Sequence, residues 1–221
     1  MTTTRTDGPD LLGITLAHRM MRTDLHRLTD VAGRIAAGAS GCTDRRAAAI
    51  ATWINTLCDE IHHHHTSEDE IAWPVIARYA AGSVDLTVLT DDHHALDPML
   101  DEVRSAVRGL TTAPTGSRGP AAGELARRLA RVRDEIDEHL DAEESGLFPV
   151  IERYVPAAEW TRIEEQVRRN GPGAQFVLPR MADVASADEW AHMRAVAGPV
   201  PAVLARLMRP GHRRRERLVF G

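Results

Sequence analysis

Six histidine and glutamate residues lie where the apolar stripe of a helix calls for a hydrophobic side chain. Around each of them leucine, isoleucine, valine and methionine recur at steps of three and four, the period of one helical face. A buried carboxylate costs several kcal/mol unless it is paired or binds a metal, so two glutamates on such stripes need a cation. Imidazole and carboxylate ligands together suit iron, zinc, copper or manganese. The six residues are His18, His64, Glu68, His93, His139 and Glu143.

The spacing of these residues also fits a metal site. His64 and Glu68 are four residues apart, and so are His139 and Glu143. Each pair therefore lies one turn apart on a single helical face, with about 5 to 6 Å between β-carbons. The arginines closest in sequence lie off these stripes or at their ends, so a metal is favoured over a salt bridge.

Six inward ligands are enough for two metal ions. Two octahedral ions offer about twelve ligand positions, of which four histidines fill four, two bridging glutamates fill four, and one oxo or hydroxo bridge fills two. About two positions remain for solvent or a small ligand such as dioxygen or peroxide. This count favours a reactive site over a closed structural one.

The chain contains two copies of one unit, related by the offset that carries His18 onto His93. The same offset places residues 61–79 on 136–154, where a histidine, a glutamate and an aromatic residue followed by proline all recur. A ligand pattern that repeats in register along two copies is stronger evidence for a metal site than one isolated pair.

Each copy predicts two helices, and together they form the elements that must position the ligands. The first helix should end in the glycine-rich stretch 33–41, and Thr43 with Asp44 can cap the second. Pro74 should kink or end the second helix, and Pro98 should kink the third. The four long helices predict an all-α, antiparallel, up-down four-helix bundle built from two helical hairpins.

The pattern changes after the second copy. We expect residues 1–157 to form the bundle and residues 158–221 to form a small helical C-terminal extension that packs on it. Helices are expected at about 159–169, after a capping box formed by Ser186 and Glu189, and at 201–208. The aromatic residues of the extension would otherwise be left in water.

The composition limits the class of protein. The chain has 221 residues, of which 43% are hydrophobic and 27% charged, which excludes a disordered tail, a collagen-like repeat and a disulfide scaffold. A net charge of −5 gives no general attraction to nucleic acid or to an anionic membrane, and neither is expected as a partner. Cys42 and Cys58 form no CxxC motif, and residues 1–10 hold no signal peptide. A cytoplasmic protein is expected, with the arginines between 206 and 217 at a solvated end.

The ligand set resembles the hemerythrin-like, or HHE cation-binding, family over roughly residues 10–155. The resemblance implies an up-down four-helix bundle, as in bacterial non-haem di-iron proteins, with two iron ions joined by an oxo or hydroxo bridge. By position, the four histidines would be terminal ligands and the two glutamates would bridge the irons. The motifs that carry it are His18, His64-x-x-x-Glu68 with Trp73-Pro74, His93, and His139-x-x-x-Glu143 with Phe148-Pro149.

The set departs from that of the oxygen-carrying hemerythrins, which use five histidines and two carboxylates. Only four histidines lie on the stripes here. Asp97, one turn beyond His93, and His65, beside His64, are the candidates for a further ligand or for a residue that supports the ligands. An oxygen donor in place of an imidazole makes the irons harder and more open. This argues against reversible oxygen carriage and for chemistry with peroxide.

The resemblance therefore implies a catalase-like oxidoreductase that acts on hydrogen peroxide in defence against oxidative stress. The alternative is a sensor or binding module for iron, oxygen or nitric oxide without turnover, and a third possibility is a structural bundle without metal. In the first two cases the partner is a small molecule: peroxide, dioxygen or nitric oxide. A ferritin-like site is disfavoured because its Glu-x-x-His motif occurs at Glu60 and His63 but has no counterpart in the second copy.

Overall fold

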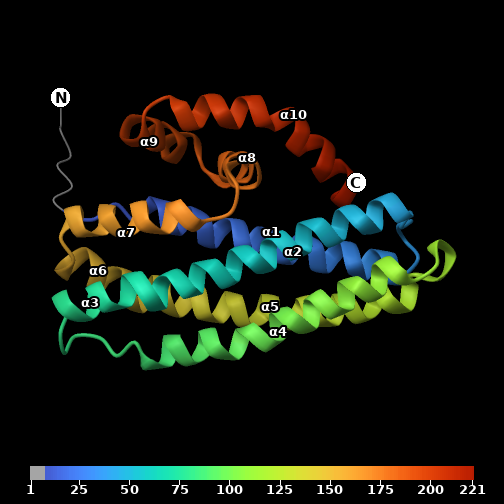
Figure 1. The fold of residues 1–221 in the computed structure, drawn as a ribbon, viewed down its shortest axis with the longest axis horizontal. Helices are drawn as coiled ribbons and strands as arrows, with labels where there is room; N and C mark the ends of the chain where they lie inside the picture. Colours follow the sequence, from blue (N-terminus) through green and yellow to red (C-terminus); the bar gives the residue numbers. More distant parts are fainter. Residues whose placement is uncertain (1–7) are drawn as a thin grey trace.

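The computed structural model describes residues 8–221, apart from the side chain of Asn170, and this part of the chain is all-helical (Figure 1). The expectation that the N-terminus holds no signal peptide falls largely on residues 1–7, which lie outside the described residues. Within residues 8–221, no helix has both the length and the apolar character that crossing a membrane would require.

Four long helices form the bundle: α1 (Leu12–Ala36), α2 (Asp44–Ser67), α4 (Thr87–Thr112) and α5 (Gly119–Ala142). Both α1 and α4 pack against α2 and α5, so each rod has two neighbours (Figure 1). Gly38 follows α1 with a φ of 71°, a conformation that glycine adopts without steric cost. The hydroxyl of Thr43 caps α2 by accepting the backbone N–H of Arg46. The all-helical bundle expected from the sequence is confirmed.

Two π-helical segments follow the bundle helices at matched positions of the repeat. They are η1 (Glu68–Ala72), after α2, and η3 (Glu143–Leu147), after α5. Each begins at a glutamate of the predicted metal site and ends before an aromatic residue and a proline. Because proline has no N–H and its ring clashes with the carbonyl four residues earlier, a wider turn fits this position. π-helical turns are also frequent at functional sites.

The α-helix resumes after each π-helical segment, as α3 (Trp73–Tyr79) and α6 (Phe148–Tyr154). Pro74 therefore follows a change of helix type and does not end the helix. The short 3₁₀ segment η2 (Thr115–Ser117) precedes α5, and α4 continues through Pro98.

The apolar core has two clusters, and a polar layer lies between them. On α4, Leu96 belongs to the larger cluster inside the bundle and Leu89 to the cluster at the α3 and α6 end. His93 lies between these two leucines and is 3% exposed. The same division on the other rods places the predicted ligands in one layer across the bundle.

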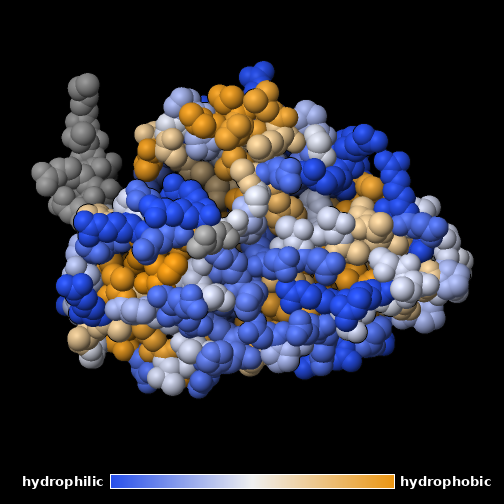
Figure 2. Space-filling view, viewed as in Figure 1, coloured by the Kyte–Doolittle hydropathy of each residue, from blue (hydrophilic) through white to orange (hydrophobic). Residues whose placement is uncertain are grey.

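Four further helices complete the chain: α7 (Ala157–Asn170), α8 (Ala174–Val184), α9 (Ala187–Ala197) and α10 (Val200–Phe220). α7 packs against η1, α8 against α1 and α10, and α10 against α2 (Figure 1). The capping box of Ser186 and Glu189 is present at the start of α9. Figure 2 shows apolar side chains gathered over α9 and α10, where Val196, Val200 and Leu207 are more than 60% exposed.

The end of α10 differs from the sequence expectation. A short helix at 201–208 was expected, but the helix runs to Phe220 and Val219 is fully buried in the larger apolar cluster. The arginines between 206 and 217 are exposed, as expected. The Arg46 guanidinium donates hydrogen bonds to the Val219 carbonyl at 3.0 and 3.3 Å. The arginines therefore lie on the outer face of a helix whose inner face packs on the bundle.

A buried ionic cluster anchors α8 to the bundle. The Nη1 of Arg180 donates to Glu60 of α2 at 2.7 Å, and its Nε lies 2.9 Å from the carboxylate of Asp24 on α1. Trp53 donates its indole N–H to the same Asp24 oxygen at 2.7 Å. Arg180 and Asp24 are 4% and 3% exposed. The arginine thus balances two acids that would otherwise be buried without a counter-charge.

Replacing Arg180 by methionine should strongly destabilise the fold. The change leaves Asp24 and Glu60 buried without their cation, a loss that typically costs about 3 to 5 kcal/mol. Urea unfolding measures the free energy of unfolding, and Arg209→Ala is the control because Arg209 pairs with Asp183 while 52% exposed. The control should change the free energy by less than about 0.5 kcal/mol. Equal losses in both variants would show that the buried cluster has no special role.

Candidate metal centre

Seven side chains meet in the polar layer of the bundle. Within each of two groups, the donor atoms lie within 4.8 Å of one another. The seven residues include all six of the sequence-predicted ligands and add His65. One group is His18, His64, Glu68 and Glu143, and the other is His65, His93 and His139.

The histidines face one another in pairs across the bundle. The Nε2 atoms of His18 on α1 and His64 on α2 are 3.1 Å apart, and those of His93 on α4 and His139 on α5 are 3.0 Å apart. Only one nitrogen of each pair can carry the proton of a hydrogen bond. A metal ion is the partner that satisfies two such lone pairs at once.

Glu68, at the start of η1, lies between the histidines of the two groups. Its Oε1 is 3.1 Å from Nε2 of His64, and its Oε2 is 3.6 Å from Nε2 of His93. Each carboxylate oxygen therefore faces a different group of imidazoles. A carboxylate placed in this way could contact a metal ion in either group of imidazoles.

Glu143 occupies the matched position at the start of η3. Its Oε2 is 3.5 Å from Nε2 of His18, and its Oε1 is 3.8 Å from Nε2 of His139. It is fully buried, as is expected of a residue at the centre of the layer. Each glutamate therefore has one oxygen near a histidine of either group, and the repeat relates the two glutamates.

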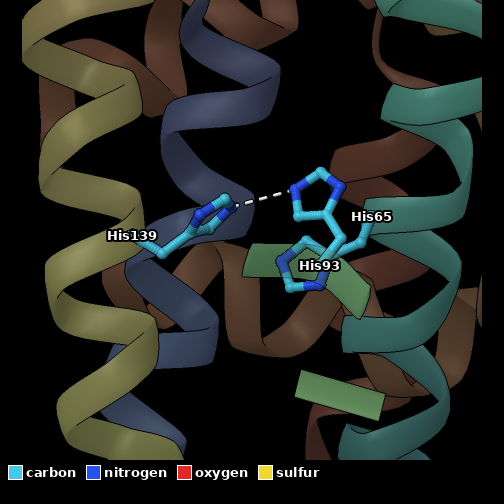
Figure 3. Close-up of side chains that lie close together, drawn as sticks. All are labelled: His65, His93 and His139. Atoms are coloured by element: carbon cyan, nitrogen blue, oxygen red, sulfur yellow. Dashed lines mark hydrogen bonds between the residues drawn. The ribbon is translucent and has the colours of Figure 1, made fainter. Parts of the chain in front are cut away.

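His65 brings a fifth imidazole into the layer. Its ring stacks on that of His93 with centroids 4.2 Å apart and an interplanar angle of 9°. Figure 3 shows His65, His93 and His139 converging from three helices, with the contact between His93 and His139 dashed. Its Nε2 is buried without a hydrogen-bond partner among the described residues. His65 therefore offers a free donor atom, although the helical period alone placed it beside the stripe.

Asp97, the other candidate named from the sequence, is not brought into the layer. Its carboxylate is 53% exposed and lies 2.9 Å from Nδ1 of His62 at the bundle surface. Four residues turn a helix by about 400°, so Asp97 is rotated from His93 toward the edge that faces α2. His62 on α2 provides its partner there.

Unpaired buried atoms test whether the residues fit a metal. Both carboxylate oxygens of Glu68 and both of Glu143 are buried without a hydrogen-bond partner among the described residues. Buried polar atoms are nearly always satisfied, so four such oxygens in one layer need an explanation. A metal cation bound among these imidazoles and carboxylates would supply it, and nitrogen and oxygen donors of this kind suit iron, zinc, copper or manganese.

A second set of carboxylates holds the outer nitrogens of the histidines. Glu144 accepts a hydrogen bond from Nδ1 of His18 at 2.9 Å, and Asp69 lies 3.1 Å from Nδ1 of His93. A carboxylate that binds the Nδ1–H directs the Nε2 lone pair toward the metal. The sequence analysis did not single out these acids. The available signal was that an acid directly follows the bridging glutamate in both copies.

Burial sets the protonation states of the layer. It lowers the pKa of His18 and lowers the pKa of His139 to about 4, so both rings are neutral near pH 7. Burial, together with Glu144 and Asp69, raises the pKa of Glu143 to about 8. Burial and the neighbouring Glu143 also raise the pKa of Glu68 well above its ordinary value. Neutral imidazoles are ready to bind metal, whereas the glutamates must first lose protons.

The fold and the layer define a class: a helical bundle with a metal-binding centre of histidines and carboxylates. The hemerythrin HHE cation binding domain family matches residues 13–151, and the chain belongs to this family. The match covers the bundle and ends before α7, so α7 to α10 lie outside it. Neither the curated proteins nor the solved structures include a significant match to this chain. The family resemblance seen in the sequence is confirmed.

Removing the outer carboxylates should weaken metal binding. Asp69→Asn and Glu144→Gln each replace the charged carboxylate beside a ligand ring by a neutral amide, and changes of such supporting residues typically lower metal affinity about 10- to 100-fold. Competition with a coloured chelator measures the affinity. Asp97→Asn is the control, because its carboxylate contacts His62 at the surface, and it should bind like the parent. A control that weakens binding as much as Asp69→Asn would contradict the assigned roles.

Metal binding should release protons at neutral pH. The raised pKa values mean that the metal-free fold favours the protonated glutamates, and a metal must displace those protons. Anaerobic titration with Fe²⁺ at pH 7, followed by calorimetry in buffers of different ionisation enthalpy, should show about two protons released per chain. The affinity should rise with pH through about 8, where Glu143 loses its proton unaided, and should go on rising until Glu68 has lost its proton as well. Glu143→Gln should release about one proton fewer, and an unchanged number would refute the assignment.

Proposed function

We propose that the chain is a non-haem di-iron protein that disproportionates hydrogen peroxide, a catalase-like oxidoreductase in defence against oxidative stress. The observation that carries the proposal is the position of Glu68 and Glu143, each with its two oxygens facing different imidazole groups. Such carboxylates hold two metal ions close together. A pair of irons supplies two-electron exchange, which the reaction of two H₂O₂ to two H₂O and one O₂ requires.

The donor count supports an open site. Five imidazole nitrogens and four carboxylate oxygens give nine protein donor atoms, and two octahedral ions have about twelve positions. Of the three positions that remain, an oxo or hydroxo bridge would fill two, so about one is left for a small ligand. With His65 included, the site reaches the five histidines of the oxygen carriers, so the argument from a missing imidazole loses force. Oxygen release from hydrogen peroxide distinguishes peroxide turnover from reversible oxygen binding.

Aromatic rings lie against one side of the layer. The ring of Phe148 lies 5.7 Å from that of His18, and Trp73 stacks on His93 at 6.0 Å. These aromatic rings cover the α3 and α6 end of the site. We place the protein in the cytoplasm, since Cys42 and Cys58 are both free and buried, which fits a reducing compartment.

The iron-loaded protein should contain two irons per chain and should release oxygen from hydrogen peroxide. The double variant His64→Ala, Glu143→Ala removes a terminal ligand and a bridge, and its oxygen release should fall by at least about 100-fold because the iron pair is no longer held. Elemental analysis and an oxygen electrode provide the two measurements. Asp97→Ala is the matched control and should keep both the iron and the activity. A double variant as active as the parent would contradict the assigned centre.

Iron content and oxygen release also distinguish a peroxide-consuming enzyme from a sensor. α7 of the extension packs against η1, the segment that begins at Glu68, so a change at this glutamate has a direct route to the extension. A chain that holds two irons but releases no oxygen from peroxide would favour a sensor of oxygen, nitric oxide or iron. A chain that binds no metal would favour a structural bundle.

A further inference from the structure

A cavity of about 260 Å³ lies between the bundle and the extension. Its bundle wall comes from α1, α2 and η1, and its other wall comes from α7 and α8. The surface of the cavity is mainly apolar, with Ile14 and Met20 on one side and Ile163, Val167 and Met181 on the other. Ionisable side chains also line it, among them Glu60, His63, Glu164 and Arg168. The cavity is therefore formed only because the extension docks on the bundle, and it is partly open to solvent.

One end of the cavity reaches the metal centre. His64 and Glu68 both line it, and His64 is the ligand whose side chain is 12% exposed. Ala17 lines the cavity beside them, and its counterpart in the repeat is Asp92, which lies 3.6 Å from Nδ1 of His139. The small alanine leaves open space on the side where the second copy places a carboxylate. The two copies thus differ at the point where the cavity meets the site.

The size of the cavity exceeds the needs of hydrogen peroxide. An apolar cavity of about 150 Å³ in another protein holds benzene, with its six carbon atoms. On that scale, 260 Å³ accepts a molecule of about ten non-hydrogen atoms. Ligand sites typically combine an apolar lining with a few placed polar groups, which describes this cavity and the two ligands at its end.

We propose that this cavity binds the apolar group of a small organic hydroperoxide, with the oxygen-bearing end beside His64 and Glu68. The proposal rests on the proposed function, since it assumes that the centre acts on peroxides, and it names a second substrate class for that site. The organic hydroperoxide is reduced to its alcohol while hydrogen peroxide is oxidised to oxygen, ROOH + H₂O₂ → ROH + H₂O + O₂, so the peroxide of the proposed function supplies the two electrons. Glu164 lines the cavity wall, and burial raises its pKa to about 7. A carboxyl that is partly neutral near pH 7 is compatible with an apolar ligand. Gly13 leaves room for the Glu164 carboxyl, because a β-carbon at residue 13 would lie 2.6 Å from Glu164 Oε1.

The test uses 2-phenylpropan-2-ol, the alcohol that corresponds to cumene hydroperoxide and has about ten non-hydrogen atoms. Its binding to the full chain is followed by calorimetry, with and without iron. Val167→Phe places a ring in the cavity, and Val150→Phe is the control, because both valines are half-buried beside the same apolar cluster and only Val167 lines the cavity. The parent and Val150→Phe should bind the alcohol alike, and Val167→Phe should bind at least about tenfold more weakly.

The outcomes distinguish this inference from the proposed function. If the parent does not bind the alcohol, or Val167→Phe binds it as tightly as the parent, the cavity proposal is overturned even when two irons and peroxide turnover are present. If the alcohol binds as expected while the iron content or the peroxide turnover is absent, the proposed function fails. The cavity then remains a site for apolar molecules, and its assignment to hydroperoxides is overturned with the function.

Discussion

Two buried carboxylates at the centre of a helical bundle are the constraint on which the rest of the structure depends. Glu68 and Glu143 are 4% and 0% exposed, and their oxygens have no hydrogen-bond partner among the described residues. Such groups are tolerated only when a cation is close or when they hold protons. The surrounding imidazoles are kept neutral by burial, so they are available as ligands and do not themselves supply the positive charge. The layer is therefore built for a charge that comes from outside the chain.

The duplication explains how four helices complete one site. The acid that follows Glu68 in the first copy contacts a histidine of the second copy, and the acid that follows Glu143 in the second contacts a histidine of the first. Neither hairpin can therefore orient all its ligands alone. The copies differ where Ala17 stands in place of a carboxylate, and this difference leaves one side of the centre open to a cavity. The repeat thus supplies matched residues to the centre, and the difference between the copies at Ala17 leaves space beside it.

The extension is part of the same construction. Arg180 inserts between Asp24 and Glu60 in the buried space between α1 and α2, which places α8 on the bundle. α7 then covers η1 and forms a wall of the cavity. The family match stops before these helices, so the cavity wall that α7 and α8 form lies outside the matched region. The bundle holds the histidines and glutamates, and the extension forms one wall of the cavity beside them.

The sequence by itself determined the bundle, the repeat and the layer of six ligands, because helical period and the cost of a buried charge are both readable from residue types and spacing. It did not determine the place of His65 or Asp97, since both lie beside a stripe and the neighbouring helix decides whether such a side chain turns inward. Asp97 meets His62 at the surface, whereas His65 stacks on His93. The pairing of Arg180 with two distant acids and the cavity against α7 also came only from the tertiary structure. These contacts join segments that lie far apart in the sequence, and a local pattern holds no information about which distant surfaces meet.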